Sequence, residues 1–92
     1  MDPYAQAISK IIKEQQAIIG PVALEQAKKV GGLQITGLDS ITIIGSRKDA
    51  LTNLVGQYAK LFGQASVEVC KEAFSHFASQ IPSSEIPDIL TG

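Results

Sequence analysis

The segment that decides the fold is IIKEQQAIIGPVALEQAK at residues 11–28, because its polarity recurs as LVGQYAKLFGQASVEVCK at residues 54–71. Each copy has an apolar helical stripe, a glycine, and a shorter apolar stripe that carries Glu-x-x-Lys. Only the glycine, the glutamate and the lysine are identical between the copies. Two amphipathic helices often agree this well, so duplication and coincidence both remain open. A true internal repeat predicts two helix-glycine-helix units around a pseudo-two-fold axis.

Working outward from the first copy, the N-terminal part predicts two helices. Asp2-Pro3 is typical of a capping residue followed by proline at the first helical position. The apolar residues up to Ile19 then recur at three and four positions, which indicates a long amphipathic helix. Pro21 interrupts it, because proline is tolerated only at the start of a new helix. The second helix should end at Gly31-Gly32, with one glycine in the left-handed conformation.

The segment between the two copies predicts a β-hairpin. Residues 33–35 and 41–44 are alternating or β-branched, and residues 36–40 between them are rich in turn formers. Two strands alone are only marginally stable in water. The hairpin must therefore lie on the helices or pair edge to edge with a second copy.

The second copy predicts two further helices. Ser46 and Asp49 resemble a capping box in front of a stripe of apolar residues at helical spacing, namely Leu51, Leu54, Val55, Tyr58, Leu61 and Phe62. After Gly63, a fourth helix should run over residues 64–80. Its apolar stripe is Val67, Cys70, Phe74, Phe77, Ala78 and Ile81. A last turn or two is expected over residues 86–90.

These elements indicate an α+β fold, mostly α, in which four to five helices form two helix-glycine-helix units that flank a hairpin. The expected order is α-α-β-β-α-α-α, within a single domain over residues 1–92.

Composition restricts the function classes. Apolar residues make up 45% and charged residues 18%, as in an ordinary globular protein. The net charge is −1 with both signs mixed along the chain, so no basic patch predicts nucleic-acid binding, and little repulsion opposes self-association. No apolar run is long enough to cross a bilayer, and the first residues have neither the basic start nor the long apolar segment of a secretory signal, so none is expected. A single cysteine excludes an internal disulfide, which favours a cytoplasmic location.

The only histidine, His76, is the natural candidate for a ligand or a base. At helical spacing it shares a stripe with Glu68 and Glu72, which would present two carboxylates and an imidazole to a metal ion or another cofactor. The simpler interpretation is a solvated face with a Glu72–His76 pair. Convincing metal motifs use two or more His or Cys ligands at fixed spacing, and none occurs here, so no cofactor is expected.

Cys70 lies in the middle of an apolar stripe and is expected to be an inert core residue. His76 is six positions away, about 240° around a helix, so the two cannot form a nucleophile–base pair within one helix. Phe62, Phe74 and Phe77 are expected to be core rather than the lining of a pocket. Anion binding at the helix starts after Gly20 and Gly63 is the less favoured interpretation of these glycines. No catalytic set remains, so the chain is not expected to be an enzyme.

The segment Ile18-Ile19-Gly20-Pro21-Val22-Ala23 is similar to the G-P-[IV]-A segment of small helical tail domains of bacterial serine/threonine kinases and other signalling proteins. The chain departs from that pattern by its hairpin and by the second copy, in which Gln64 replaces the proline. The resemblance implies a bacterial regulatory or interaction accessory without catalytic machinery. It transfers no functional residues.

The sequence therefore predicts a non-enzymatic protein–protein interaction or regulatory module that forms a homodimer. The expected interface anchors are aromatic and aliphatic side chains of the first helix and the hairpin: Tyr4, Ile8, Ile12, Ile41 and Ile43. The alternative is a small-molecule, haem or metal sensor that binds its ligand between the helical repeats through His76.

Overall fold

The computed structural model describes residues 2–90 and confirms a mostly α, α+β fold. Its four α-helices are α1 (Pro3–Ile19), α2 (Val22–Lys28), α3 (Arg47–Phe62) and α4 (Gln64–Ser75). The hairpin of β1 (Leu33–Gly37) and β2 (Ser40–Ile43) lies between the two helix pairs in the chain. Three short 3₁₀ turns follow α4, at Ala78–Gln80, Ser83–Glu85 and Asp88–Leu90. None of the helices described is long and apolar enough to cross a membrane.

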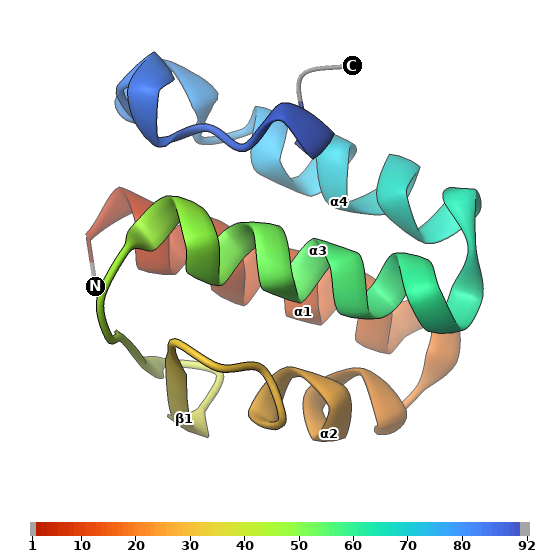
Figure 1. The fold of residues 1–92 in the computed structure, drawn as a ribbon. Helices are drawn as coiled ribbons and strands as arrows, with labels where there is room; N and C mark the ends of the chain where they lie inside the picture. Colours follow the sequence, from red (N-terminus) through yellow and green to blue (C-terminus); the bar gives the residue numbers. More distant parts are fainter. Residues whose placement is uncertain (1, 91–92) are drawn as a thin grey trace.

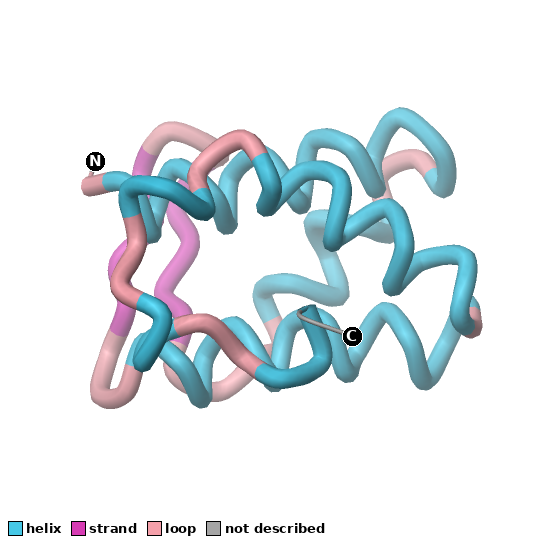
Figure 2. The backbone as a smooth tube through the Cα atoms, turned by 90° about the horizontal axis from the view of Figure 1, so that it is seen from above, coloured by secondary structure: helices cyan, strands magenta, loops and turns pink. Residues whose placement is uncertain are grey.

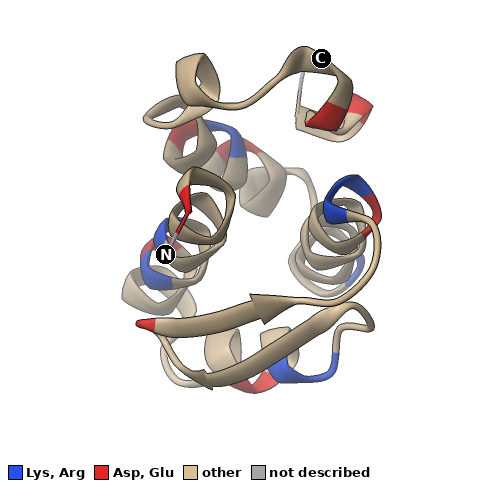
Figure 3. Cartoon of the chain, turned by 90° about the vertical axis from the view of Figure 1, so that its left-hand side faces the viewer, with Lys and Arg blue, Asp and Glu red and all other residues tan. Residues whose placement is uncertain are grey.

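The helices are arranged around α1 and α3, which run in the same direction through the middle of the molecule (Figure 1). The unit of α2 and the hairpin lies on one side of this pair, and α4 with the 3₁₀ turns lies on the other (Figures 1 and 3). Both α1 and α3 pack against α2 and against α4. Seen from above, the hairpin occupies one end of the molecule and the two helix-glycine-helix corners the other (Figure 2).

The two long helices begin as their capping residues predict. The carboxylate of Asp2 accepts a hydrogen bond of 2.9 Å from the backbone N–H of Ala5, with Pro3 in the first turn. The hydroxyl of Ser46 accepts one of 3.2 Å from the N–H of Asp49. These side chains satisfy backbone donors that the first helical turn leaves unpaired.

The two glycine corners have nearly the same backbone. Gly20 (φ 75°, ψ −157°) donates its N–H to Gln16 O, and Gly63 (φ 81°, ψ −167°) donates its N–H to Ala59 O, both over 2.9 Å. This region of backbone space is open almost only to glycine. The glycine therefore determines the backbone conformation of both corners, although the next residue differs: Pro21 in the first corner and Gln64 in the second. The corners agree in geometry; an internal duplication of the sequence stays a prediction.

The hairpin is supported by helices of its own chain. Leu33 pairs with Ile43 and Ile35 with Ile41 in an antiparallel register, with an irregularity between Ile35 and Gly37. β1 packs against α2 and β2 against α1, which buries Leu33 and Ile41. Of the two expected arrangements, the folded chain itself provides the support, so the hairpin requires no second copy.

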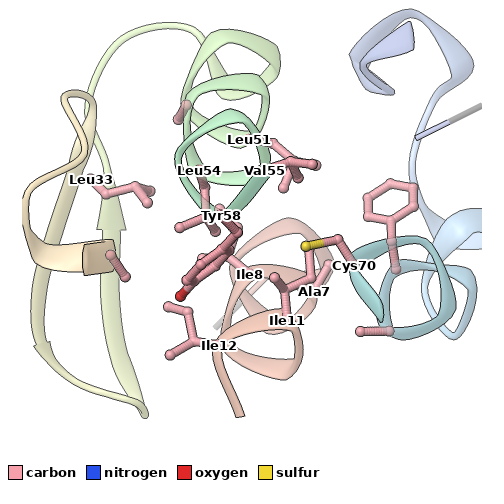
Figure 4. Packing of buried hydrophobic residues seen from close by; sticks show 14 of the residues in the cluster. Ala7, Ile8, Ile11, Ile12, Leu33, Leu51, Leu54, Val55, Tyr58 and Cys70 are labelled. Carbon is pink, nitrogen blue, oxygen red and sulfur yellow. The ribbon is translucent and has the colours of Figure 1, made fainter. Parts of the chain in front are cut away.

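The core lies between α1 and α3 and extends to both outer layers (Figure 4). Its fully buried side chains on α1 and α3 are Ala7, Ile8, Ile11, Ile12, Leu51, Leu54, Val55 and Tyr58. The predicted stripe of α3 is confirmed up to Tyr58, but Leu61 and Phe62 are exposed. They lie after Tyr58 in the last turn of α3, directly before the corner at Gly63.

The predicted length of α4 is wrong, because the helix ends at Ser75 rather than at residue 80. The hydroxyl of Ser75 donates a 2.6 Å hydrogen bond to the carbonyl of Glu72, a local contact that competes with helical backbone bonding. Phe77 then leaves the helical region at φ −121°. The apolar stripe nevertheless reaches the core, since Phe74 and Ile81 are buried and Phe77 packs against the cluster.

Candidate functional site

The candidate metal ligands on α4, Glu68, Glu72 and His76, do not converge. Lys71 Nζ lies 3.2 Å from the carboxylate of Glu68, and Gln64 Nε2 donates to the same carboxylate over 3.1 Å. These hydrogen bonds lower the pKa of Glu68. Glu72 and His76 are exposed, and His76 lies at the C-terminal cap of the helix. Residues 2–90 contain no group of three His, Cys, Asp or Glu side chains placed to hold a metal ion.

Cys70 is fully buried in the core, as its apolar stripe predicts. Its sulfur accepts a hydrogen bond of 3.4 Å from Gln15 Nε2. Burial raises the pKa of the Cys70 thiol to about 11, against the smaller opposing effect of the Gln15 amide. A nucleophilic cysteine needs an exposed thiolate in positive surroundings, so this thiol is a packing group.

A buried polar contact that the sequence did not predict joins α1 to α4. Gln15 is fully buried, and its Nε2 donates to Ser66 O over 2.9 Å as well as to Cys70. Its Oε1 has no hydrogen-bond partner among the described residues. The available signal was a polar residue inside the apolar stripe of the first helix, four positions after Ile11.

Two buried tyrosines anchor backbone carbonyls. Tyr58 donates its hydroxyl to Ala23 O over 2.7 Å, which joins α3 to α2. The Tyr4 hydroxyl lies 2.7 Å from the carbonyl oxygen of Arg47 and 3.0 Å from that of Glu85. Burial raises the pKa of both phenols. Both groups serve packing and lie outside any cavity identified in the described chain.

The structure corrects the choice of interface anchors. Tyr4, Ile8, Ile12 and Ile41 are buried within the single chain, and Ile43 is half-buried against the same core. A side chain that already fills the core of its own subunit has no apolar area left for a partner. The periodicity identified an apolar stripe correctly, but it did not show which neighbour covers that stripe.

The exposed apolar surface lies at the glycine corners instead. Four of the five large exposed apolar side chains among residues 2–90 flank these corners: Ile18 (65% exposed), Val22 (38%), Leu61 (46%) and Phe62 (37%). Both corners are at the same end of the molecule (Figures 1 and 2). We call these four residues the apolar end.

The apolar end is also free of charge in the sequence. No charged residue occurs over residues 15–24 or over residues 61–67, although 18% of the chain is charged. Elsewhere acidic and basic residues alternate over the helices (Figure 3). These two uncharged windows were the signal by which the sequence alone could have located this surface.

Two shallow cavities complete the surface. The first, of about 260 Å³, lies beside Lys10, Lys13, Asp39 and Phe77, and its lysines are paired: Lys10 with Glu14 at 2.9 Å and Lys13 with Asp39 at 3.8 Å. The second, of about 490 Å³, lies between the end of α2 and one face of α3, and we call it the α2–α3 groove. It differs from the first in that no carboxylate of the described chain lines it.

Comparisons of the chain with protein-family models, with curated proteins and with solved structures give no match. The function is therefore argued from the geometry of these surfaces.

Proposed function

We propose that this chain is a small non-enzymatic interaction module, of a regulatory kind, that self-associates through its apolar end. The observation that carries the proposal is the gathering of Ile18, Val22, Leu61 and Phe62 at one end of the chain, whereas the other large apolar side chains of residues 2–90, apart from Ile44, are buried or half-buried. Exposed apolar clusters of this kind on small proteins are characteristic of contact surfaces.

The chemistry of this end favours a second copy as the partner. In a symmetric dimer the same patch meets itself, so a patch with charges of one sign would bring like charges of the two copies close together. The uncharged windows 15–24 and 61–67 avoid that repulsion, and the net charge of −1 adds little at longer range.

The corners also suit a two-fold arrangement. Ile18 and Leu61 hold equivalent positions before Gly20 and Gly63, and the two corners share one backbone conformation. The Gly20 corner of each copy can therefore pack against the Gly63 corner of the other copy, which gives two equivalent contacts. Four partly exposed side chains offset only part of the entropy of association, so we expect a dissociation constant on the order of micromolar.

The same proposal places the protein in the cytoplasm and assigns it no catalytic role. Its single cysteine is a buried thiol with a raised pKa, and His76 is remote from it at the exposed end of α4. The mixing of positive and negative side chains supports a protein partner rather than nucleic acid.

Sedimentation velocity of matched variants tests the proposal. We expect the wild-type protein to sediment as a dimer at concentrations above the micromolar range, and Leu61→Glu to sediment as a monomer, because the dimer would bury the new charge. Ile44→Glu is the control, since Ile44 is 57% exposed but lies near the end of the hairpin.

A purely monomeric wild-type protein at hundreds of micromolar would contradict the proposal, and so would equal loss of the dimer in both variants. Circular dichroism of both variants establishes that they retain the helical fold.

A further inference from the structure

We propose that the α2–α3 groove binds a small organic dianion, with one oxyanion group held at each of its two lysines. The groove holds about 490 Å³, within the range of small-molecule sites. The proposal does not depend on self-association.

The first support is charge. Lys29 and Lys60 line the groove, and neither forms an ion pair among residues 2–90. Lys10, Lys13 and Lys71 each lie within ion-pair distance of a carboxylate, whereas Lys28 and Lys48 also form no ion pair among residues 2–90 but line neither cavity. An unpaired ammonium on each side of an acid-free groove attracts an anion from solution.

The second support is the spacing along α3. The groove follows Thr52, Asn53, Gly56, Gln57 and Lys60, which form one face of the helix. Eight residues of helix span about 12 Å. The Asn53 amide and the second N–H of the Gln57 amide can donate hydrogen bonds to an anion, whereas the Thr52 hydroxyl already donates to Lys48 O over 2.7 Å.

The two lysines lie toward opposite ends of this face. Gln57 Nε2 donates to Gln26 Oε1 over 2.7 Å, which fixes the level at which α2 passes α3. Because the two helices run in opposite directions (Figure 1), Lys29, which follows Gln26 on α2, lies toward Asn53. Lys60 lies beyond Gln57 in the other direction. The flexible lysine stems allow the ammonium groups to close on a ligand shorter than the groove.

The third support is two glycines that the fold does not require. Gly56 lies inside α3, where glycine costs about 1 kcal/mol relative to alanine. Its φ is not positive, and an added Cβ would meet nothing within 4 Å. Gly31 on the opposite wall is equally unconstrained. The neighbouring Gly32 differs, because its φ of 90° favours glycine and a Cβ added to it would lie 3.4 Å from Ala50 Cβ. The unconstrained glycines keep the groove open.

The lining defines the ligand class. Polar and apolar atoms contribute equally to the surface of the groove, so the body of the ligand is of mixed polarity, and its two ends carry phosphate or carboxylate groups. Both groups present the same charged oxygens to a lysine.

Titrations of ¹⁵N-labelled protein at constant ionic strength test this inference. Inorganic pyrophosphate and glutarate are the two probes, and they separate a phosphate from a carboxylate ligand. We expect saturable shifts of amides in residues 29–31 and 52–60 with at least one probe. Lys29→Gln together with Lys60→Gln should weaken binding at least roughly tenfold, since each removes a charge-assisted hydrogen bond. Gly56→Ala should weaken binding without unfolding the chain.

The control is Lys10→Gln together with Lys13→Gln, which removes the same charge beside the other cavity and should leave the affinity unchanged. Shifts that do not saturate with either probe would overturn the proposal. Equal weakening by the two lysine pairs, or full affinity in Gly56→Ala, would overturn it as well.

Discussion

The side chain of Gln15 occupies a position on α1 that the apolar spacing assigns to the core, and the structure buries it completely. Its amide nitrogen bonds Ser66 O and Cys70 Sγ, so it fixes how α4 lies against α1. The unpaired Oε1 costs about 1–3 kcal/mol as a buried acceptor. Burial of the amide therefore orients one helix against another rather than adding stability.

Cys70 gives a pH-dependent prediction at the same scale. Burial raises the pKa of its thiol from 9.0 to about 11, so the folded state favours the neutral form. The stability that this shift contributes is fully present below pH 9 and is lost as the pH rises through about 11. Between pH 9 and pH 11, the free energy of unfolding measured in urea should fall more steeply with pH for the wild type than for Cys70→Ala.

The comparison with Cys70→Ala leaves the Tyr4 phenol unchanged, so the difference between the two proteins reports the thiol together with its smaller electrostatic effect on the pKa of Tyr58, which is raised mainly by burial. Parallel pH profiles of the two proteins would contradict the burial of an ionisable thiol at this position.

At the scale of elements, the glycine corners are the most specific feature, and they give a second prediction. Gly20→Ala and Gly63→Ala should each lower the free energy of unfolding by about 1–3 kcal/mol, since alanine is strained at these backbone angles. The added methyl meets nothing within 4 Å in either case, so the cost is that of the backbone alone.

Gly56→Ala is the matched control, with an expected gain of about 1 kcal/mol from helix propensity. Thermal and urea unfolding of the three variants measure these changes. If all three variants lost a similar free energy of unfolding, the backbone angles of Gly20 and Gly63 would not explain the loss at the corners.

Much of the element order follows from local sequence chemistry. Asp2, Ser46 and the two corner glycines mark where helices begin and end, and each acts through a backbone group that it bonds or a backbone angle that it permits. The end of α4 at Ser75 did not follow, because no glycine or proline marks it. A local hydrogen bond from the Ser75 hydroxyl to Glu72 O accompanies the end of the helix, and the sequence alone does not show that this bond forms.

The functional surfaces were harder to predict than the helices. Spacing identified the apolar stripe of α1 correctly, yet Tyr4, Ile8 and Ile12 serve the subunit's own core rather than a partner. The apolar end and the α2–α3 groove combine residues from separate helices. The two uncharged windows could have indicated the apolar end, but only the packing of the helices shows that the two corners meet at one end and that Lys29 and Lys60 line one groove.

At the scale of the whole molecule, the two ends have different character. The hairpin and the turns at Ala78–Gln80 and Ser83–Glu85 lie near one end, where the guanidinium of Arg47 lies 2.8 Å from the carboxylate of Asp2 and 4.0 Å from that of Glu85. The other end carries the two corners and most of the exposed apolar area. A dimer through the apolar end would leave the hairpin exposed to solvent. The side of the α2–α3 groove that carries Lys29 would also stay exposed, and both would be available to a further partner or ligand.

The central claim is that this apolar end is the self-association surface, and a dilution series of ¹⁵N-labelled protein followed by two-dimensional NMR tests it most directly. The proposal predicts that amide shifts change with concentration around residues 17–22 and 61–66, while amides of the hairpin at residues 33–43 stay constant. Shifts that do not depend on concentration up to the millimolar range, or that change only in the hairpin, would contradict it.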